Sequence, residues 1–352
     1  MSIETSEFVN PRRTADGKEP LLDINTLYVE YLTRRGPAKA VNNVSFSIQP
    51  GEVFGLAGES GCGKSTIAHT ILRVLKPPAV ITGGQILFDG EDVLKMNDRQ
   101  LEDFRWRKVS MVFQSAMNSL NPVITVGEQV TDVILRHNKV SKKDAYDRAA
   151  ELLKIVGIEP ERLKSFPHQM SGGMRQRVVI AIALALNPAM MIMDEPTTAL
   201  DVVVQKDILQ QIQQLKETMG FSILFITHDV SLMVEFSDYM AIMYAGEIVE
   251  KAASKEIFTN PIHPYTQGLL SSFPSLTGKK RKLTGIPGSP PDLVNPPTGC
   301  KFHPRCTRCT HKETEVAPQL TEVLPGHWVA VHAGMPLPTG NDRIGQSSVA
   351  KR

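Results

Sequence analysis

The stretch that decides the fold is GESGCGKST, residues 58–66. It matches the pattern G-x-x-x-x-G-K-[ST], whose glycines let successive backbone N–H groups turn toward a single anion. The apolar run Glu52–Ala57 precedes it, and the helical pattern Thr66–Leu75 follows it and stops before Pro77-Pro78. The sequence therefore predicts a strand, a phosphate-binding loop and a helix whose positive N-terminus faces the phosphates.

Each residue type in this loop suits a triphosphate bound together with Mg²⁺. Lys64 can place its charge on the β- and γ-phosphates, and the Ser65 hydroxyl can ligate the metal. Cys62 is expected to be a small filler inside the loop. We expect the nucleotide to contact most of the stretch, through Gly58, Ser60, Gly61, Cys62, Gly63, Lys64, Ser65 and Thr66.

Apolar runs alternate with helical patterns in the second half of the chain. Met190–Met193, Ser222–Thr227 and Tyr239–Tyr244 have the continuous apolar character of buried strands. Between them, Val202–Lys216 and Val230–Phe236 have helical patterns. This alternation is typical of a parallel sheet covered by helices on both faces, so we predict an α/β fold.

Two earlier regions have different patterns. Leu21–Tyr31 and Ala40–Ile48 alternate partially and are separated by turn residues 34–37, which predicts two strands. From about Leu101 to Leu186 the pattern is mostly helical. Within that region one predicted helix has a single apolar stripe, made of Ala145, Ala149, Leu152, Leu153 and Val156.

Polar residues with matching chemistry follow three of the apolar runs. Asp194 can hold Mg²⁺ through a water, and Glu195 can polarise a water for attack on the γ-phosphate. His228 ends the next strand, so it is expected at the same edge of the sheet as Glu195, where ligands bind. Gln114 follows the run Val109–Phe113 and can reach Mg²⁺ or the attacking water. We expect four residues to carry the catalysis: Lys64, Gln114, Glu195 and His228.

Length and composition limit the class of protein. The 352 residues correspond to roughly two domains. The 39 basic and 37 acidic residues give a net charge of +2, which argues against a nucleic-acid partner. Four cysteines are too few for a disulfide scaffold. No secretory signal or membrane-spanning run is evident, so we expect an intracellular, soluble protein.

A second glycine pair, in SGGMRQR at residues 171–177, has no use in a lone phosphate-loop enzyme. Glycines at the start of a helix make a second anion site, here from Ser171, Gly172 and Gly173. One chain cannot bring both sites to the same nucleotide without strain, which predicts a dimer with shared sites. At this point the sequence resembles the ATP-binding-cassette (ABC) ATPases, over about Leu21 to Lys251.

The resemblance implies a P-loop NTPase fold with an antiparallel β subdomain and a helical signature subdomain at about residues 115–180. Residues 58–66 resemble the Walker A loop, Gln114 the Q-loop, residues 171–176 the signature with Met174 where Gln is commoner, and residues 199–201 the D-loop. Ser65, Gln114 and Asp194 are then the Mg²⁺ residues. Tyr31 is the candidate that stacks on adenine, with Tyr28 as the alternative.

The family also implies partners. Two ATPase subunits, copies or paralogues, form a head-to-tail sandwich around ATP. Its closure and hydrolysis drive two transmembrane permease subunits, whose coupling helices contact the Gln114 loop. The chain is then an ATP hydrolase, attached through the permease to the cytoplasmic face of the plasma membrane.

The C-terminal region resembles the tail of the oligopeptide/dipeptide-importer ATPases, on the motifs NPIHPYT (260–266), GIPG (285–288) and GCKFHPRC (299–306). We expect a tail at 1–20, a nucleotide-binding domain at 21–258, and a loop-rich extension at 259–352 rather than a second large core. The basic run 279–282 is expected to be a solvated patch, with anionic lipid as the alternative.

Some members of that family carry a [4Fe–4S] cluster on four cysteines in this tail. Here the cysteines are Cys300, Cys306 and Cys309, and Val331 stands where the fourth is expected. The sequence leaves open an iron–sulfur cluster, a zinc ion, or no metal. If there is a fourth ligand, the nearby candidates are His311, His327 and His332.

The expected function is to power uptake of peptides across the bacterial plasma membrane with an extracytoplasmic solute-binding protein. The same branch also serves oligosaccharides and nickel. A non-transport ABC ATPase for DNA repair is less favoured, because the 57 residues from Gln114 to Ser171 leave no room for a long coiled coil. A translation-type member would carry two cassettes, and a regulator without turnover would lack Glu195 or His228.

Overall fold

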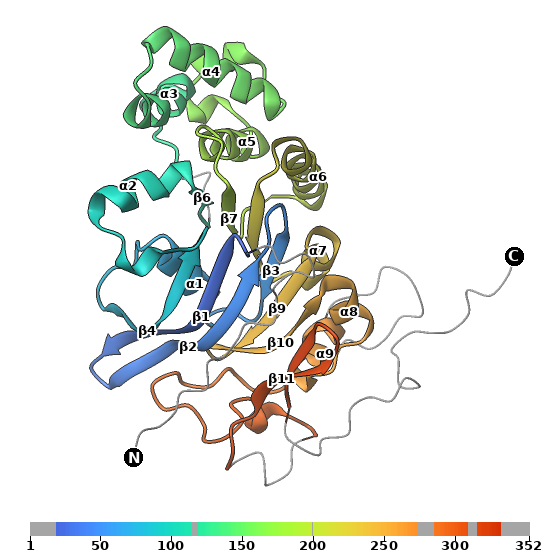
Figure 1. Ribbon diagram of the computed structural model, residues 1–352. Coiled ribbons are helices and arrows are strands. Elements are labelled where there is room, and N and C mark those ends of the chain that lie inside the picture. The colour runs from blue at the N-terminus through green and yellow to red at the C-terminus, as the bar shows by residue number, and fades with distance from the viewer. Residues whose placement is uncertain (1–18, 115–118, 199, 273–284, 309–314, 332–352) are drawn as a thin grey trace, which may run out of the picture.

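The structure is a computed structural model, and it describes residues 19–114, 119–198, 200–272, 285–308 and 315–331 (Figure 1). Some residues named above therefore lie outside the described residues, namely most of the expected tail 1–20, Ala199 of the D-loop, the basic run 279–282, Cys309, His311 and His332.

The centre of the fold is an eight-stranded sheet with the order β11-β12-β10-β9-β3-β8-β7-β6. Five of its strands run parallel and are buried almost throughout, as their continuous apolar sequences predict. These are β3 (Val53–Ala57), β6 (Val109–Val112), β7 (Met190–Asp194), β8 (Ser222–Ile226) and β9 (Tyr239–Tyr244). The α/β prediction and the three strands predicted in the second half of the chain are confirmed.

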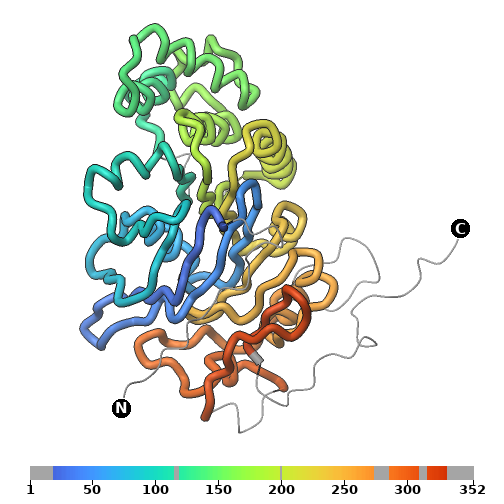
Figure 2. Tube along the Cα trace, viewed as in Figure 1, coloured from blue at the N-terminus to red at the C-terminus, as the bar shows by residue number. Residues whose placement is uncertain are grey.

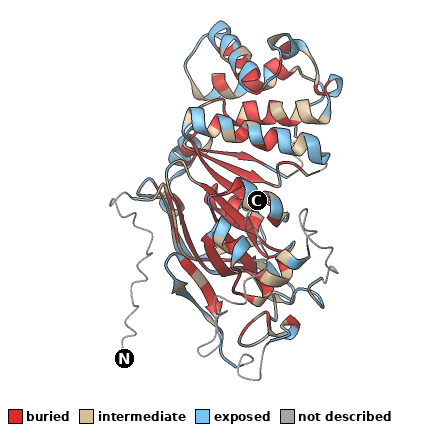
Figure 3. Ribbon diagram, turned by 90° about the vertical axis from the view of Figure 1, so that its right-hand side faces the viewer, coloured by how far each residue is buried: buried red, intermediate tan, exposed pale blue. Residues whose placement is uncertain are grey.

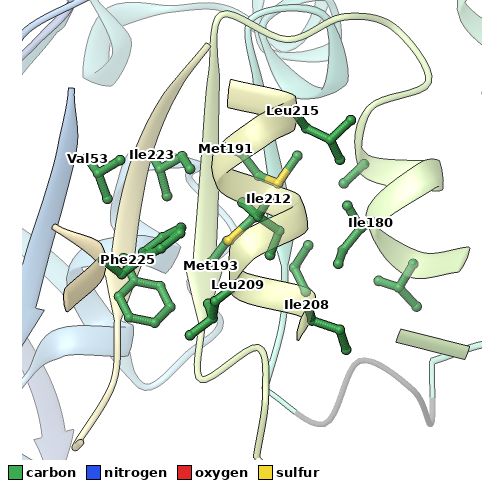
Figure 4. Packing of buried hydrophobic residues seen from close by; sticks show 14 of the residues in the cluster. Val53, Ile180, Met191, Met193, Ile208, Leu209, Ile212, Leu215, Ile223 and Phe225 are labelled. Carbon is green, nitrogen blue, oxygen red and sulfur yellow. The ribbon is translucent and has the colours of Figure 1, made fainter. Parts of the chain in front are cut away.

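Two hydrophobic clusters cover the two faces of this sheet. Along β7, Met191 and Met193 belong to one cluster, whereas Met190 and Ile192 belong to the other, as the two-residue period of a strand requires. Figure 4 shows the first face, where the two methionines lie against helix α6 (Val202–Met219). The second face packs against α1 (Lys64–Ile71) and the antiparallel sheet.

The antiparallel sheet has the order β2-β1-β4-β5. Its first two strands, β1 (Leu22–Thr33) and β2 (Gly36–Ile48), confirm the predicted pair and are joined by a turn at Arg34-Arg35. The strands β4 (Ala79–Phe88) and β5 (Glu91–Asp92) complete it. A short helix, η1 (Val93–Lys95), and α2 (Asp98–Arg107) lead from there to β6.

A helical group stands at one end of the molecule, away from the antiparallel sheet (Figures 1 and 3). It contains α3 (Val126–His137), α4 (Lys142–Ile155), the turns η3 (Pro160–Lys164) and η4 (Pro167–Gln169), and α5 (Gly172–Ala183). The predicted apolar stripe of α4 is confirmed, because all five of its residues are fully buried. Figure 3 shows that these helices bury one side and expose the other.

The C-terminal region joins the central sheet. Strand β10 (Glu247–Ala253) is followed by two helices, α8 (Ser254–Thr259) and α9 (Pro264–Ser271). Both helices contact α7 (Val230–Phe236), which precedes β10 in the chain. A turn, η5 (His303–Arg305), precedes the hairpin of β11 (Gln319–Leu324) and β12 (His327–Val331). Strand β12 pairs antiparallel with β10, so the hairpin extends the sheet.

The loop-rich extension expected at 259–352 is therefore partly joined to the central sheet. Residues 285–308 do run as an irregular segment along the molecule (Figure 2). However, Tyr265, Cys300 and Phe302 are buried in the same hydrophobic cluster as the central helices. Among the described residues, no helix combines the length and the apolar character that crossing a bilayer requires.

Candidate functional site

The glycine-rich loop begins where β3 ends, as predicted. Gly58 has φ +148° and Gly63 has φ +109°, a region that side chains other than glycine rarely adopt. A Cβ on Gly58 would lie 2.2 Å from the carbonyl oxygen of Met243, and a Cβ on Gly63 would lie 2.2 Å from that of Ala40. The two glycines therefore allow the loop to turn tightly against β9 and β2 before α1 begins.

Lys64 lies inside this loop. Its ammonium donates hydrogen bonds to the carbonyl oxygens of Gly58 at 2.7 Å and Glu59 at 3.0 Å, and the side chain is buried. The Cys62 thiol lies 3.5 Å from the same nitrogen, and burial raises its pKa. The thiol thus stays protonated and fills space, which agrees with the interpretation of Cys62 as a small filler. The loop places a buried cation and the first turn of α1 at one point, a site suited to phosphate.

Tyr31 lies beside this site. Its hydroxyl is 3.3 Å from the Thr66 hydroxyl on the first turn of α1, and the ring is partly exposed. Tyr28, the alternative, lies instead over Gly83 of the neighbouring strand, 3.2 Å from the position of a Cβ on that glycine. The geometry favours Tyr31 over Tyr28, and its stacking on adenine stays a prediction.

Asp194 ends β7 next to the loop. It is 2% exposed, and its Oδ1 atom has no hydrogen-bond partner among the described residues. Burial raises the pKa of this carboxyl, whereas a hydrogen bond with Ser65 and the nearby charge of His69 lower it. A buried carboxylate oxygen without a partner, beside a hydroxyl, has the hard-oxygen chemistry that Mg²⁺ prefers, so these residues fit the metal.

Glu195 follows directly and is held by three side chains. Its Oε2 atom accepts a hydrogen bond from Gln114 Nε2 at 2.9 Å and from the Thr198 hydroxyl at 3.1 Å. Its Oε1 atom lies 3.0 Å from His228 Nδ1. The backbone of Glu195 has φ +47°, a strained conformation for a residue other than glycine. Its N–H donates to the Ile226 carbonyl at 2.8 Å, so the turn that follows β7 is held against β8.

The structure thus brings Gln114 together with Glu195 and His228, the two residues that the sequence places at one edge of the sheet. Thr198 was missed by the sequence reasoning. A hydroxyl three residues after the last acid of a buried strand, on a tight turn, is a signal for such a contact, because i and i+3 meet across one turn. The catalytic roles of the four residues stay predictions.

The signature residues lie elsewhere in the same chain. Ser171 caps α5, its hydroxyl accepting the N–H of Met174 at 3.2 Å, and Gly172 and Gly173 form the first turn. Ser171 is exposed. Helix α5 lies with α3 and α4, whereas α1 lies beside the antiparallel sheet, so the two anion sites stand apart (Figure 1). This agrees with the expectation that one chain does not assemble both on one nucleotide.

The hypothesis of an iron–sulfur or zinc site gains no support. Among the described residues there is no group of three His, Cys, Asp or Glu side chains that could hold a metal. Cys300 is buried in an apolar cluster, where burial raises the pKa of its thiol and disfavours the thiolate that binds metals. His327 pairs instead with Glu250, its Nε2 atom 2.7 Å from Oε1. Cys309 lies outside the described residues.

Comparisons with known proteins identify the family of this chain. The family model described as "ABC transporter" matches residues 41–198, and "Oligopeptide/dipeptide transporter, C-terminal region" matches residues 249–312. The oligopeptide transport ATP-binding protein OppD of Bacillus subtilis is 44% identical over 313 residues, which cover 88% of this chain and 87% of OppD. The dipeptide transport ATP-binding protein DppD of the same organism is 46% identical over 291 residues, covering 82% and 87%.

A solved structure gives the same result for the fold. The dimeric post-hydrolysis state of the ATP-binding cassette MJ0796, bound to ADP and Pi, aligns with a TM-score of 0.59 at 30% identity. The alignment covers 66% of this chain and 98% of that chain. Together, the loop, the strand-end carboxylates and the separate signature helix define the class of the ABC ATPase cassette. Within that class, the chain belongs to the ATP-binding proteins of oligopeptide and dipeptide ABC transporters.

Proposed function

We propose that this chain binds and hydrolyses MgATP as one ATPase subunit of a transporter that imports peptides. The observation that carries the hydrolytic part is the Glu195 carboxylate, oriented by Gln114, Thr198 and His228 next to Asp194. A carboxylate fixed in this way is a suitable base for a water that attacks the γ-phosphate.

The same geometry supports the roles that we propose in nucleotide binding. The loop N–H groups, Lys64 and the first turn of α1 bind the phosphates, and Tyr31 contacts the adenine. Ser65, Gln114 and Asp194 hold Mg²⁺, which neutralises charge on the phosphates when bound. His228 contacts the γ-phosphate and holds Glu195.

The exposed signature supports the dimeric part of the proposal. Ser171 and its two glycines present free backbone N–H groups of a 12-residue helix, apart from the loop of the same chain. In a head-to-tail dimer, these groups complete the partner subunit's nucleotide site. The partner is a second ATPase subunit, a paralogue or another copy.

The transport part of the proposal rests on the relatives, which are named as oligopeptide and dipeptide transport proteins. We infer that two permease subunits and an extracytoplasmic solute-binding protein complete the assembly. The chain then works at the cytoplasmic face of the plasma membrane. The exposed Phe113, next to Gln114, is apolar surface suited to contact with a permease.

One experiment tests the proposal as a whole. The chain is purified with the permease subunits that co-isolate, and ATP hydrolysis in vesicles is measured with the solute-binding protein and short peptides, oligosaccharides or nickel. We expect short peptides to raise turnover, and the complex with Glu195→Gln to show no rise. Stimulation by nickel or an oligosaccharide alone would contradict the peptide assignment, and an absence of ATP hydrolysis in every case would contradict the ATPase assignment.

A further inference from the structure

Glu59, a position that the phosphate-loop pattern leaves unspecified, is the point where the C-terminal region meets the nucleotide site. Its carboxylate pairs with Arg305, its N–H donates to the Tyr265 hydroxyl at 2.9 Å, and its carbonyl oxygen accepts from Lys64 at 3.0 Å. We propose that Arg305 and Tyr265 are positioning residues of the nucleotide site, which hold the loop through Glu59 in the conformation that binds phosphate. The inference rests on the proposed function of this loop in binding ATP.

The contact between Arg305 and Glu59 is the stronger of the two. The residues are 246 positions apart, and the guanidinium binds the carboxylate in bidentate form, Nη1 to Oε2 at 2.6 Å and Nη2 to Oε1 at 2.9 Å. The remaining guanidinium contacts are Nε to the Pro287 carbonyl at 2.7 Å and Nη1 to the Tyr244 hydroxyl at 3.3 Å. The Arg305 side chain is only 5% exposed. A buried guanidinium needs its anion, so this pair fixes the position of Glu59.

Tyr265 provides a second, independent contact from α9. Its side chain is fully buried, with its ring centroid 4.6 Å from that of Tyr244 and 5.4 Å from that of Phe302. The start of α9 is itself tied to β10, because Glu250 accepts the N–H groups of Ile262 at 2.8 Å and of His263 at 3.0 Å. These contacts fix the position of the Tyr265 hydroxyl, which accepts the hydrogen bond from the Glu59 N–H.

The loop has a physical need for such contacts. Gly58 and Gly61, on both sides of Glu59, have φ of +148° and +80°, and glycines at these positions allow many other conformations. Glu59 and Lys64 are linked through the Glu59 carbonyl, so a displacement of Glu59 also displaces the ammonium. When only a fraction of molecules has the competent loop, the apparent dissociation constant rises by the inverse of that fraction.

The experiment compares nucleotide affinity in full-length variants, by titration with a fluorescent ATP analogue. We expect Arg305→Ala to raise the dissociation constant about tenfold and Tyr265→Phe about threefold. Because Arg305 acts through Glu59, the double variant Arg305→Ala/Glu59→Gln should bind no more weakly than Glu59→Gln alone. The matched control is Arg35→Ala, which removes another ion pair of the C-terminal region, with the exposed Asp292, and leaves the affinity unchanged.

Melting temperatures without nucleotide show which variants fold. If Arg305→Ala does not fold, Arg305→Met, which keeps the volume of the side chain, replaces it in the same cycle. Unchanged affinity in the Arg305 and Tyr265 variants would overturn the inference. Effects of Arg305→Ala and Glu59→Gln that multiply in the double variant would also overturn it, because the loss would then not pass through Glu59. Wild-type protein that binds no ATP would remove the proposed function itself, whereas equal binding by wild type and variants removes the inference alone.

Discussion

Replacing Glu195 by glutamine changes one atom of the carboxylate and little of its surroundings. Oε2 accepts from Gln114 at 2.9 Å and from Thr198 at 3.1 Å, and Oε1 lies 3.0 Å from His228 Nδ1. The glutamine carbonyl can keep the first two hydrogen bonds, and its amide can face the imidazole. The variant Glu195→Gln therefore keeps the geometry of the site and loses the group that accepts a proton.

The size of the effect follows from this loss. A positioned general base contributes about 10²- to 10⁴-fold to a rate. The expected loss corresponds to about 3–5 kcal/mol of the activation free energy. Glu195 is not proposed as a phosphate ligand, so we expect the dissociation constant for MgATP to change less than about threefold. A change of this size corresponds to less than about 1 kcal/mol of binding free energy.

The assay measures steady-state phosphate release at saturating MgATP, together with nucleotide affinity by titration. The control is Glu235→Gln on α7, which removes an exposed carboxylate paired with Lys206 and leaves turnover unchanged. A fall in kcat of less than tenfold for Glu195→Gln would refute the role of Glu195 as the base. A large loss of MgATP affinity would refute the claim that the amide preserves the site.

Three further predictions follow from buried charges. Lys64→Ala should weaken MgATP binding at least about tenfold, because it removes a charged hydrogen-bond donor, and titration checks this. Asp194 has a raised pKa, so the folded state holds its proton more tightly than the unfolded chain and loses stability as the pH rises above the ordinary carboxyl range. Asp194→Asn should therefore raise the melting temperature of the nucleotide-free protein at pH 7 by about 2 °C, with no gain near pH 3, and abolish Mg²⁺-dependent binding. Glu250→Ala leaves His327 and two amide N–H groups buried without their acceptor, and should lower the free energy of unfolding by about 3–5 kcal/mol in denaturant titration. For comparison, Glu151→Ala, which breaks an exposed ion pair with Arg148, should cost less than about 1 kcal/mol.

The phosphate loop and the polar residues at the strand ends could be predicted from the sequence, because each of these elements has one strong sequence pattern. The strands before Asp194 and His228 are continuous apolar runs, and parallel strands present their carboxyl ends at one edge. Two fixed glycines and a lysine define the loop without reference to distant residues. The left-handed backbone of Glu195 could not be predicted, because it depends on the hydrogen bond to Ile226 across the sheet.

The C-terminal hairpin was missed for a different reason. Strand β11 is mostly exposed, and its polar Gln319, Thr321 and Glu322 show no apolar alternation. Its partner β12 is placed by contacts with β10, where the Lys251 ammonium lies 5.2 Å from the Trp328 ring centroid. Such contacts join residues far apart in the chain, and local patterns do not reveal them. The same is true of the pair of Arg305 with Glu59.

The spacing of the cysteines in the C-terminal region is not enough to establish a metal site. Cys300 and Cys306 lie six positions apart, yet the first is buried in an apolar cluster together with Phe302. A spacing of cysteines identifies a candidate, but the surroundings decide whether a thiolate is stable.

In the proposed dimer, the phosphate loop of one subunit and the signature of another enclose the same nucleotide. The most direct test is the mass of the Glu195→Gln chain, measured by light scattering with and without MgATP, both alone and with the co-isolated transporter subunits. We predict an ATP-dependent pairing of two cassettes, and its loss in the double variant with Ser171→Arg, whose own MgATP affinity stays unchanged. A Glu195→Gln chain that binds MgATP but pairs with no second cassette in either setting would contradict this shared site, and so would pairing that survives Ser171→Arg.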